Sequence, residues 1–329
     1  MIPTLLGGER LRRAIESLER QQYSDFQVVI VDNSGRRVAA ELEGRPRLHV
    51  VFNSANAGFG RAVNQAAELS RSVFIATLND DACASPAWLQ ALAGALEADP
   101  RAGMAACRIR LEDQPDRLDS AGLGIFADGA TKQRGRLAPA EAFNRMEEAL
   151  LPSGCAALYR RELFEELGGF DPDYFVYGED SDLGLRARLA GWTCLYVPQA
   201  EVWHAYSVSA GRASPLKAYY VERNRLLTIV KTFPPRLLLT SFWHTFRRYL
   251  GHWRAARAGR GLAGEFARAK GGVLKLVVIV IAAHAAALRR LPHLLRQRRA
   301  LRRARQLDDR GFRRLLERFG VTVEEIAAQ

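Results

Sequence analysis

Two groups of acidic side chains directly follow short apolar runs, where they could bind a cation or accept hydrogen bonds from a ligand. Asp32 follows the run FQVVIV, and Asn79-Asp80-Asp81 follows VFIATL. Mg²⁺ bound to phosphates takes oxygen ligands, often one or two carboxylates with water completing the shell. A single Asp or Asn at such a place also fits an ordinary turn. Two such groups at successive strand ends favour a binding site.

A second acidic cluster lies in the segment Gly178-Glu179-Asp180-Ser181-Asp182. Three carboxylates in four residues repel one another unless a cation, a positive group or a helix N-terminus offsets them. Asp182 precedes Arg186 by four residues, the spacing of an ion pair on a helix surface. Glu179 and Asp180 have no partner at such a spacing. They are candidates for a functional site, with N-capping of the next helix as the alternative.

Two weaker signals complete the set. The segment Asn56–Gly60 (NAGFG), followed by Asn64, places small residues before a helix, so the backbone could approach a phosphate or ribose. The spacing matches neither the dinucleotide fingerprint nor the P-loop, and a glycine-rich helix cap explains it equally well. His204 follows Trp203, and a lone histidine is more often structural than a ligand.

The elements that must position these residues alternate between strand and helix patterns over the first 110 residues. Continuous apolar runs predict strands at 26–31, 48–52 and 73–78, and helical spacing predicts helices at 9–22, 59–70 and 86–98. This alternation predicts an α/β fold with a doubly wound, mostly parallel sheet flanked by helices. Ligands of such sheets bind beyond the carboxyl ends of the strands.

The pattern is weaker further along the chain. Residues 111–150 are polar and predict a loop or short hairpin. A strand is expected at 153–159, with helices at 161–167 and 181–190, and two short strands at 195–197 and 200–203 around Pro198. Beyond about residue 215 the pattern becomes helical and basic, so we expect a basic helical C-terminal region.

The positive charge is concentrated in that C-terminal region. The 329 residues carry a net charge of +12, of which residues 1–230 contribute −4 and residues 231–329 contribute +16. Such asymmetry suggests a partner with a negative surface, either an anionic membrane or nucleic acid.

One segment of this region has the pattern of an interfacial helix. The apolar run Val273–Leu288 is interrupted by Lys275 and His284 and is too short to span a bilayer. Arg289–Arg305 follows it with eight arginines. This pattern predicts a segment lying at the membrane surface, and burial in a helical bundle or a homodimer is the alternative.

Two further features bear on the compartment. No secretory signal is visible at the N-terminus. The four cysteines form no CxxC pair and are expected to be free thiols in a reducing compartment.

Taken in order, several motifs resemble those of the family 2 glycosyltransferases of the GT-A fold, especially the bacterial rhamnosyltransferase-like members. The resemblance covers about residues 2–205. The motifs are IPT (2–4), VVIVDNS (28–34), NAGFGRAVN (56–64), LNDDA (78–82), GCAALYRRELFEELGGFD (154–171), YGEDSDLGLRARLAGW (177–192) and VPQAEVWH (197–204).

The resemblance implies an inverting, metal-dependent transfer of a sugar from a nucleotide-diphosphate donor to a hydroxyl of a glycan or polyprenyl-linked acceptor. Rhamnose is the sugar that it suggests, and cell-envelope polysaccharide biosynthesis is the implied setting. The implied cofactor is Mg²⁺ or Mn²⁺. An enzyme of this kind is expected in the cytoplasm, peripheral on the inner face of the cell membrane, with no nucleic-acid partner.

The resemblance also assigns roles to individual residues. Asp180 matches the base of the family's acidic pair, with Glu179 beside it, and Asp81 and His204 match metal ligands. The positions matching nucleotide-sugar contacts are Pro3, Thr4, Asp32, Asn56, Gly58, Asn64, Asn79 and Asp80. Asn79 replaces the first aspartate of the family's DXD motif, which leaves Asp81 as the expected ligand. The chain begins at Met1, so the first strand is expected to be short or missing.

We therefore expect a GT-A catalytic domain over residues 1–215 and a basic, membrane-associated region over 216–329. Two alternatives come from other classes. A sugar-phosphate nucleotidyltransferase would need a glycine-rich, basic loop after the first strand, and Leu5–Arg10 resembles one only faintly. A nucleic-acid-binding module could use the basic C-terminal third, but no helix-turn-helix, zinc-finger or RNP-type motif accompanies the charge.

Overall fold

The computed structural model describes residues 1–205, 214–258, 264 and 272–328. The chain forms two compact units. The first comprises Met1–Leu123, Gln133–Arg188 and Trp192–Ser209, and the second comprises Gly124–Lys132, Leu189–Gly191 and Ala210–Gln329.

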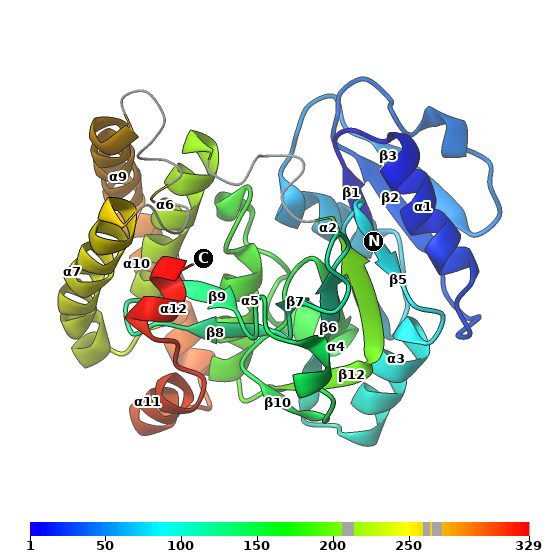
Figure 1. Ribbon diagram of the computed structural model, residues 1–329. Coiled ribbons are helices and arrows are strands. Elements are labelled where there is room, and N and C mark those ends of the chain that lie inside the picture. The colour runs from blue at the N-terminus through cyan, green and yellow to red at the C-terminus, as the bar shows by residue number, and fades with distance from the viewer. Residues whose placement is uncertain (206–213, 259–263, 265–271, 329) are drawn as a thin grey trace. The chain divides into compact units, whose positions relative to one another are not determined.

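The first unit is built on two sheets. Three parallel strands form the first sheet: β1 (Ile2–Thr4), β2 (Val28–Asp32) and β3 (Leu48–Phe52) (Figure 1). The second sheet has the order β10-β12-β6-β11-β4, with β5 on β12 and β7 on β6. Its strands are β4 (Phe74–Leu78), β5 (Ala82–Ala84), β6 (Ala102–Leu111), β7 (Leu118–Ser120), β10 (Glu147–Ala149), β11 (Ala156–Arg160) and β12 (Thr193–His204).

The short first strand joins the two sheets. β1 pairs with β2, while the Met1 ammonium donates to the carbonyl of Ala76 and the Met1 carbonyl accepts from the amide of Leu78, both in β4. The expected short first strand is therefore present with three residues. It places Thr4 at the edge where β4 ends.

The second sheet is buried on both faces, because alternate residues of its strands face different cores. In β11, Ala156 and Leu158 pack with α1 (Gly8–Glu19) and α3 (Trp88–Ala98). Ala157 and Tyr159 pack instead with α2 (Phe59–Glu68), α4 (Arg161–Glu166) and α5 (Glu179–Leu189). The expected α/β class is confirmed, but the expectation of a mostly parallel sheet was wrong. The first sheet is parallel, whereas in the second sheet β12 and β6 pair in parallel and the other described pairs are antiparallel.

Two sequence expectations about elements need correction, and one strand was missed. The hairpin expected within residues 111–150 is present as β8 (Leu123–Ile125) and β9 (Thr131–Gln133), but β7 and β10 also lie there, and all three residues of β7 are buried. The two strands expected around Pro198 are one strand, β12, whose register against β6 shifts between Val197 and Glu201. The long strand β6 was not anticipated at all.

The second unit is mainly helical. It contains α6 (Pro215–Thr232), α7 (Pro235–Arg257), α9 (Gly272–Arg289), α10 (Leu291–Ala304), α11 (Asp309–Arg318) and α12 (Val323–Ala328). Helix α6 packs against α9 and α10, and α12 packs against α7. Much of the hairpin of β8 (Leu123–Ile125) and β9 (Thr131–Gln133) also belongs to this unit. Among the described residues, none of the helices combines the length and apolarity needed to cross a membrane.

Candidate active site

The pairing of strands β5 and β12 brings Asp81 and His204 together. Antiparallel pairing of β5 with β12 sets His204 opposite Ala82, one residue after Asp81. His204 Nε2 then lies 3.2 Å from Asp81 Oδ1, although the sequence separates them by more than 120 residues. Both side chains are 9% exposed. The expected proximity of these two residues is present in the structure, and their role as metal ligands stays a prediction.

Asp119 fixes the orientation of the imidazole and was not singled out from the sequence. It lies in β7 and is 3% exposed, and its Oδ2 is 2.7 Å from His204 Nδ1. Its other oxygen, Oδ1, accepts a hydrogen bond from Arg136 within an ion pair. A histidine that binds a metal usually donates the N–H of its second ring nitrogen to a carboxylate, a backbone carbonyl or water. No sequence signal distinguished Asp119, because it lies in a weakly patterned segment.

The surroundings of His204 and Asp81 shift the pKa values of both side chains. Burial alone would lower the pKa of His204, but Cys155, Asp119 and Asp81 outweigh it and raise that pKa well above its usual range. Burial would raise the pKa of Asp81, but the hydrogen bond and charge of His204 hold it below its usual range. Asp81 is therefore ionised and its negative charge faces the imidazole.

This donor set fits a divalent cation. Carboxylate oxygen and imidazole nitrogen together suit Mn²⁺, and Mg²⁺ accepts the oxygen. Two neighbouring ligands of an octahedral ion at about 2.1 Å lie about 3 Å apart, close to the separation of Asp81 and His204. Among the described residues there is no group of three or more His, Cys, Asp or Glu placed to hold an ion. The rest of the shell would come from the ligand and water.

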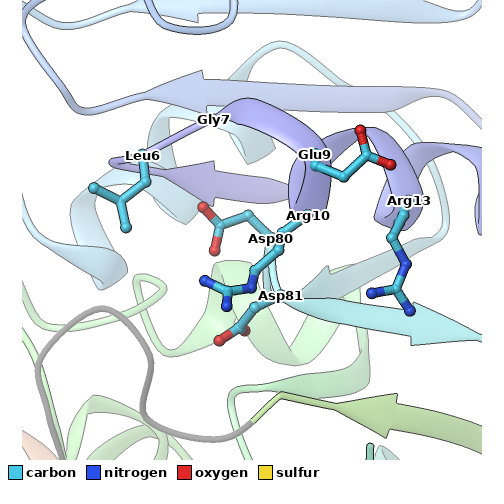
Figure 2. Close-up of a pocket in the computed structure, with 7 residues that line it drawn as sticks. All are labelled: Leu6, Gly7, Glu9, Arg10, Arg13, Asp80 and Asp81. Atoms are coloured by element: carbon cyan, nitrogen blue, oxygen red, sulfur yellow. The ribbon is translucent and has the colours of Figure 1, made fainter.

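A cavity of about 400 Å³ opens beside Asp80 and Asp81. Figure 2 shows the Arg10 guanidinium of α1 close to both carboxylates, with Arg13 on the same wall. Thr4 Oγ1 donates to Asp80 Oδ2 at 2.5 Å, which ties β1 to this wall. Burial nevertheless raises the pKa of Asp80 above its usual range. The Arg10 guanidinium acts on Asp81, and a positive side chain beside a carboxylate suits a diphosphate that shares a cation with the protein.

The acidic pair Glu179 and Asp180 occupies the first turn of α5, which begins two residues earlier than expected. Asp180 Oδ2 accepts from the Gly154 amide at 2.9 Å, and its Oδ1 accepts from the amide and hydroxyl of Ser181. Glu179 is 7% exposed, and its Oε2 has no hydrogen-bond partner within the part of the chain that the structure describes. The two acids therefore differ in how well a negative charge is supported.

Burial raises the pKa of both acids. The pKa of Glu179 rises to about 8, with the charge of Asp180 adding to the effect of burial. Burial also raises the pKa of Asp180, against the hydrogen bonds from Gly154 and Ser181. Because Asp180 accepts those bonds, it is the better place for the charge and Glu179 the better place for the proton. The pair can thus hold one proton near neutral pH.

Consecutive residues connect the acidic pair to the histidine group. The Gly154 amide bonds Asp180, and the thiol of the next residue, Cys155, lies beside the His204 imidazole. The Cys155 carbonyl also accepts from the Asn79 amide at 2.8 Å. A carboxylate able to accept a proton and a pair of candidate metal ligands thus lie at one end of the second sheet.

Asp182 is not part of this site, and its expected place on the helix surface was wrong. Its side chain is fully buried and accepts from Arg186 Nε at 2.8 Å and from the Tyr174 hydroxyl at 3.1 Å. Arg186 also donates to the carbonyls of Leu167 and Gly169. The i,i+4 partner was identified correctly, but the pair lies in the core and fixes the loop before α5.

The other sequence candidates make structural contacts. Asp32 is 1% exposed, and its oxygens accept from the amides of Ser34 and Ala39, so it closes the turn after β2. Asn56 Oδ1 accepts from the Gly58 amide. Both polar atoms of the Asn64 amide bond the backbone of Phe170. Nucleotide contacts by these residues and by Pro3 stay predictions.

Gly58 is required by packing. Its φ is +87°, and an added Cβ would lie 2.3 Å from the carbonyl oxygen of Phe175. The neighbouring amide of Phe59 donates to that same carbonyl at 2.8 Å. A side chain is therefore excluded by the loop before α5, so close approach of a ligand is not needed to explain this glycine.

Comparison with known proteins identifies the family. The sequence model of Glycosyl transferase family 2 matches residues 1–168. The chain is 32% identical over 240 residues to the N-acetylglucosaminyl-diphospho-decaprenol L-rhamnosyltransferase of Mycobacterium tuberculosis, covering 65% of this chain and 78% of the relative.

Solved structures agree on the fold. GalNAc-T7 with UDP, GalNAc and Mn²⁺ has a TM-score of 0.59 at 16% identity, covering 78% of this chain, which spans about half (49%) of that one. The mannosyltransferase PcManGT of Pyrobaculum calidifontis, with GDP-Man and Mn²⁺, has a TM-score of 0.50 at 20% identity and covers 87% and 85% of the two chains. The fold is thus GT-A, and the chain belongs to glycosyl transferase family 2.

Proposed function

We propose that the protein transfers a sugar from a nucleoside-diphosphate donor to an acceptor hydroxyl with inversion at the anomeric carbon and a divalent cation. The observation that carries the proposal is the contact of Gly154 with Asp180 and of Cys155 with His204. It supports a proton acceptor and a cation site that serve one reaction centre.

In this mechanism Asp180 is the base. Its carboxylate takes the proton of the acceptor hydroxyl while that oxygen bonds to the anomeric carbon and the bond to the donor diphosphate breaks. Glu179 keeps its own proton, so that the pair of Glu179 and Asp180 buries only one negative charge. The α5 N-terminus and the Gly154 amide hold the Asp180 carboxylate in place.

Asp81 and His204 hold the cation, and Asp119 orients His204. When bound, Mg²⁺ or Mn²⁺ stabilises the charge that develops on the leaving diphosphate. Arg10 adds positive charge at the same wall of the cavity. Thr4 and Asp80 shape the neighbouring edge of the nucleotide site, to which we also assign Pro3, Asp32, Asn56, Gly58, Asn64 and Asn79.

The donor and acceptor are proposed from the mycobacterial relative. Its name specifies L-rhamnose and an N-acetylglucosaminyl-diphospho-decaprenol acceptor, and it matches 65% of this chain. We assign this chain a rhamnose donor and a polyprenyl-linked acceptor in envelope polysaccharide synthesis. Residues 1–215 are the catalytic part. Residues 216–329, above all 270–305, keep the enzyme at the inner face of the cytoplasmic membrane; residues 270 and 271 lie outside the described part.

A donor screen tests the reaction. The purified chain is incubated with individual nucleotide sugars, with and without Mg²⁺ or Mn²⁺, and release of nucleoside diphosphate is measured. We expect metal-dependent release from one donor, with dTDP-rhamnose the first candidate. Equal release in the presence of a chelator would contradict the metal-dependent mechanism, and no release from any donor would contradict the function.

A further inference from the structure

Helix α7 in the second unit has its apolar and polar faces reversed. Helices of globular proteins normally bury their apolar stripe and expose the polar one. The large apolar side chains of α7 are instead its exposed ones, and their spacing of three, four, seven and fourteen residues places them on one face. They are Leu239 (70% exposed), Phe242 (68%), Trp243 (62%), Phe246 (56%) and Trp253 (51%).

The buried face of the same helix is charged. Arg248 Nε donates to Asp128 Oδ2 at 2.6 Å, and its Nη2 donates to Glu222 Oε2 at 2.8 Å. The Tyr249 hydroxyl donates to Glu222 Oε1 at 2.7 Å, and Arg225 Nη2 donates to the same oxygen. Removing one partner of a buried ion pair is strongly unfavourable. This network therefore fixes the rotation of α7 and keeps its aromatic face outward.

The exposed aromatic side chains of α7, called here the aromatic patch, are accompanied by arginines. Trp243 and Phe246 stack with ring centroids 5.6 Å apart and planes 25° apart. Arg236, Arg247, Arg254 and Arg257 are exposed on the same helix, and the Arg257 guanidinium lies over the Trp253 ring at 4.8 Å. Neither α7 nor α9 nor α10 contains an acidic residue. The partner of this patch must accept both apolar rings and positive charge.

Helix α9, in the same unit, also exposes its large apolar side chains. It buries the small residues Ala283 and Ala287 and packs against α6. Its large side chains Leu274, Val278 and Ile281 are 74%, 57% and 62% exposed. Two helices of one unit thus expose apolar side chains between basic residues, which is unusual for a surface in contact with water alone.

We propose that α7 is a membrane-binding element that inserts Phe242, Trp243 and Phe246 into the interface of an anionic phospholipid bilayer. Aromatic side chains are favoured at the boundary between headgroups and acyl chains, and arginines bind the anionic headgroups. The combination of a large apolar face with basic flanks and no acid is that of an interfacial helix. This deepens the membrane location proposed above, which was assigned to residues 270–305, and it is independent of the reaction.

Vesicle cosedimentation with three matched variants tests this element. The α7 variant is Phe242→Ser/Trp243→Ser/Phe246→Ser, and the α9 variant is Leu274→Ser/Val278→Ser/Ile281→Ser. The control replaces three exposed apolar residues of the first unit, Leu69→Ser/Val73→Ser/Leu137→Ser. Each is mixed with phosphatidylglycerol–phosphatidylcholine vesicles and with phosphatidylcholine alone. We expect anionic vesicles to bind the wild type and the control, and the α7 variant to bind at least about tenfold more weakly.

Quenching of tryptophan fluorescence tests the inference first in the wild-type protein, without any substitution. Brominated lipids in the anionic vesicles should quench the exposed Trp243 and Trp253, but not Trp88, which is 1% exposed. In Trp243→Phe/Trp253→Phe, which keeps the aromatic face, the quenching should disappear while vesicle binding persists. Donor turnover should equal that of the wild type in the α7 variant and in Trp243→Phe/Trp253→Phe. Failure of this inference is therefore distinguishable from failure of the proposed reaction.

Three outcomes would overturn the inference. The first is full binding by the α7 variant together with loss of binding by the α9 variant. The second is absence of lipid quenching of Trp243 and Trp253 in the wild type. The third is a concentration-dependent dimer in sedimentation velocity that the α7 substitutions abolish, without vesicle binding by the wild type, because a second copy of the chain would then be the partner of this face.

Discussion

The two acidic groups of the first unit contain the same kind of side chain in opposite surroundings. Asp81 faces His204, with Arg10 nearby, and its pKa is lowered. Glu179 has an unbonded carboxyl oxygen beside another acid, and its pKa is raised to about 8. A carboxylate that stays ionised suits a cation, whereas a pair that retains a proton suits proton transfer. The difference teaches that burial alone does not define the role of an acid.

Replacing the proton acceptor should have the largest effect on the reaction. Asp180→Asn keeps the size of the side chain but cannot take the acceptor proton. We expect turnover to fall about 10²–10⁴-fold, the range for general base catalysis, with donor binding kept. Steady-state kinetics and donor titration would measure the two quantities. Turnover within a few-fold of the wild type would remove Asp180 from the role of base.

Asp182 is two residues away in the same cluster and should behave differently. Asp182→Asn leaves Arg186 buried without its carboxylate partner, so we expect a loss of about 3–5 kcal/mol in the free energy of unfolding. Urea denaturation would measure it, with Asp173→Asn, in the loop just before, as a variant of a less buried acid. An unchanged unfolding midpoint together with lost turnover would instead place Asp182 in the reaction.

Replacing Asp119, which orients His204, should weaken binding of the cation. Asp119→Asn leaves Asp81 and His204 in place but removes the charge that orients the ring, so we expect Mn²⁺ affinity to fall about 10–100-fold. Asp116→Asn, an exposed acid close by in the chain, is the matched control. Calorimetric Mn²⁺ titration would measure both, and equal affinity in wild type and Asp119→Asn would show that the residue does not position His204.

The last expected effect is a change in the pH dependence of the free energy of unfolding. In the folded state Glu179 has a raised pKa, so the folded protein holds a proton that the unfolded chain releases at lower pH. The stability of the wild type should therefore fall as pH rises from about 4.5 toward 8, relative to Glu179→Gln. Unfolding temperatures across this pH range would measure the difference. Parallel curves for the two proteins would mean that Glu179 does not retain its proton.

The sequence predicted those elements whose own composition specifies them. The apolar runs that became β2 and β4 lie largely buried in the sheets, so apolar residues dominate their sequences. The central strand β6 was missed because Ala102–Leu111 is mostly small residues with Arg108 and Arg110, whose charges are paired across the sheet. Its burial comes from its neighbours and is not visible in its sequence.

Those site residues could be predicted whose role is indicated by neighbours in the sequence. Glu179, Asp180 and Asp81 stood out through neighbours in the chain, and His204 through its motif. Asp119 did not, because its partners His204 and Arg136 are 85 and 17 residues away. Spacing also paired Asp182 with Arg186 correctly but could not reveal burial, since a helix places residues four apart side by side on any face.

The central claim is that Asp81 binds the cation and Asp180 accepts the proton. Mn²⁺ binding in one pair of variants tests it most directly. Mn²⁺ is titrated by electron paramagnetic resonance into wild type, Asp81→Asn and Asp180→Asn, each with the nucleoside diphosphate that the donor screen identifies. The account predicts at least about tenfold weaker binding for Asp81→Asn and unchanged binding for Asp180→Asn. Wild-type affinity in Asp81→Asn, or a loss in Asp180→Asn as large as in Asp81→Asn, would contradict it.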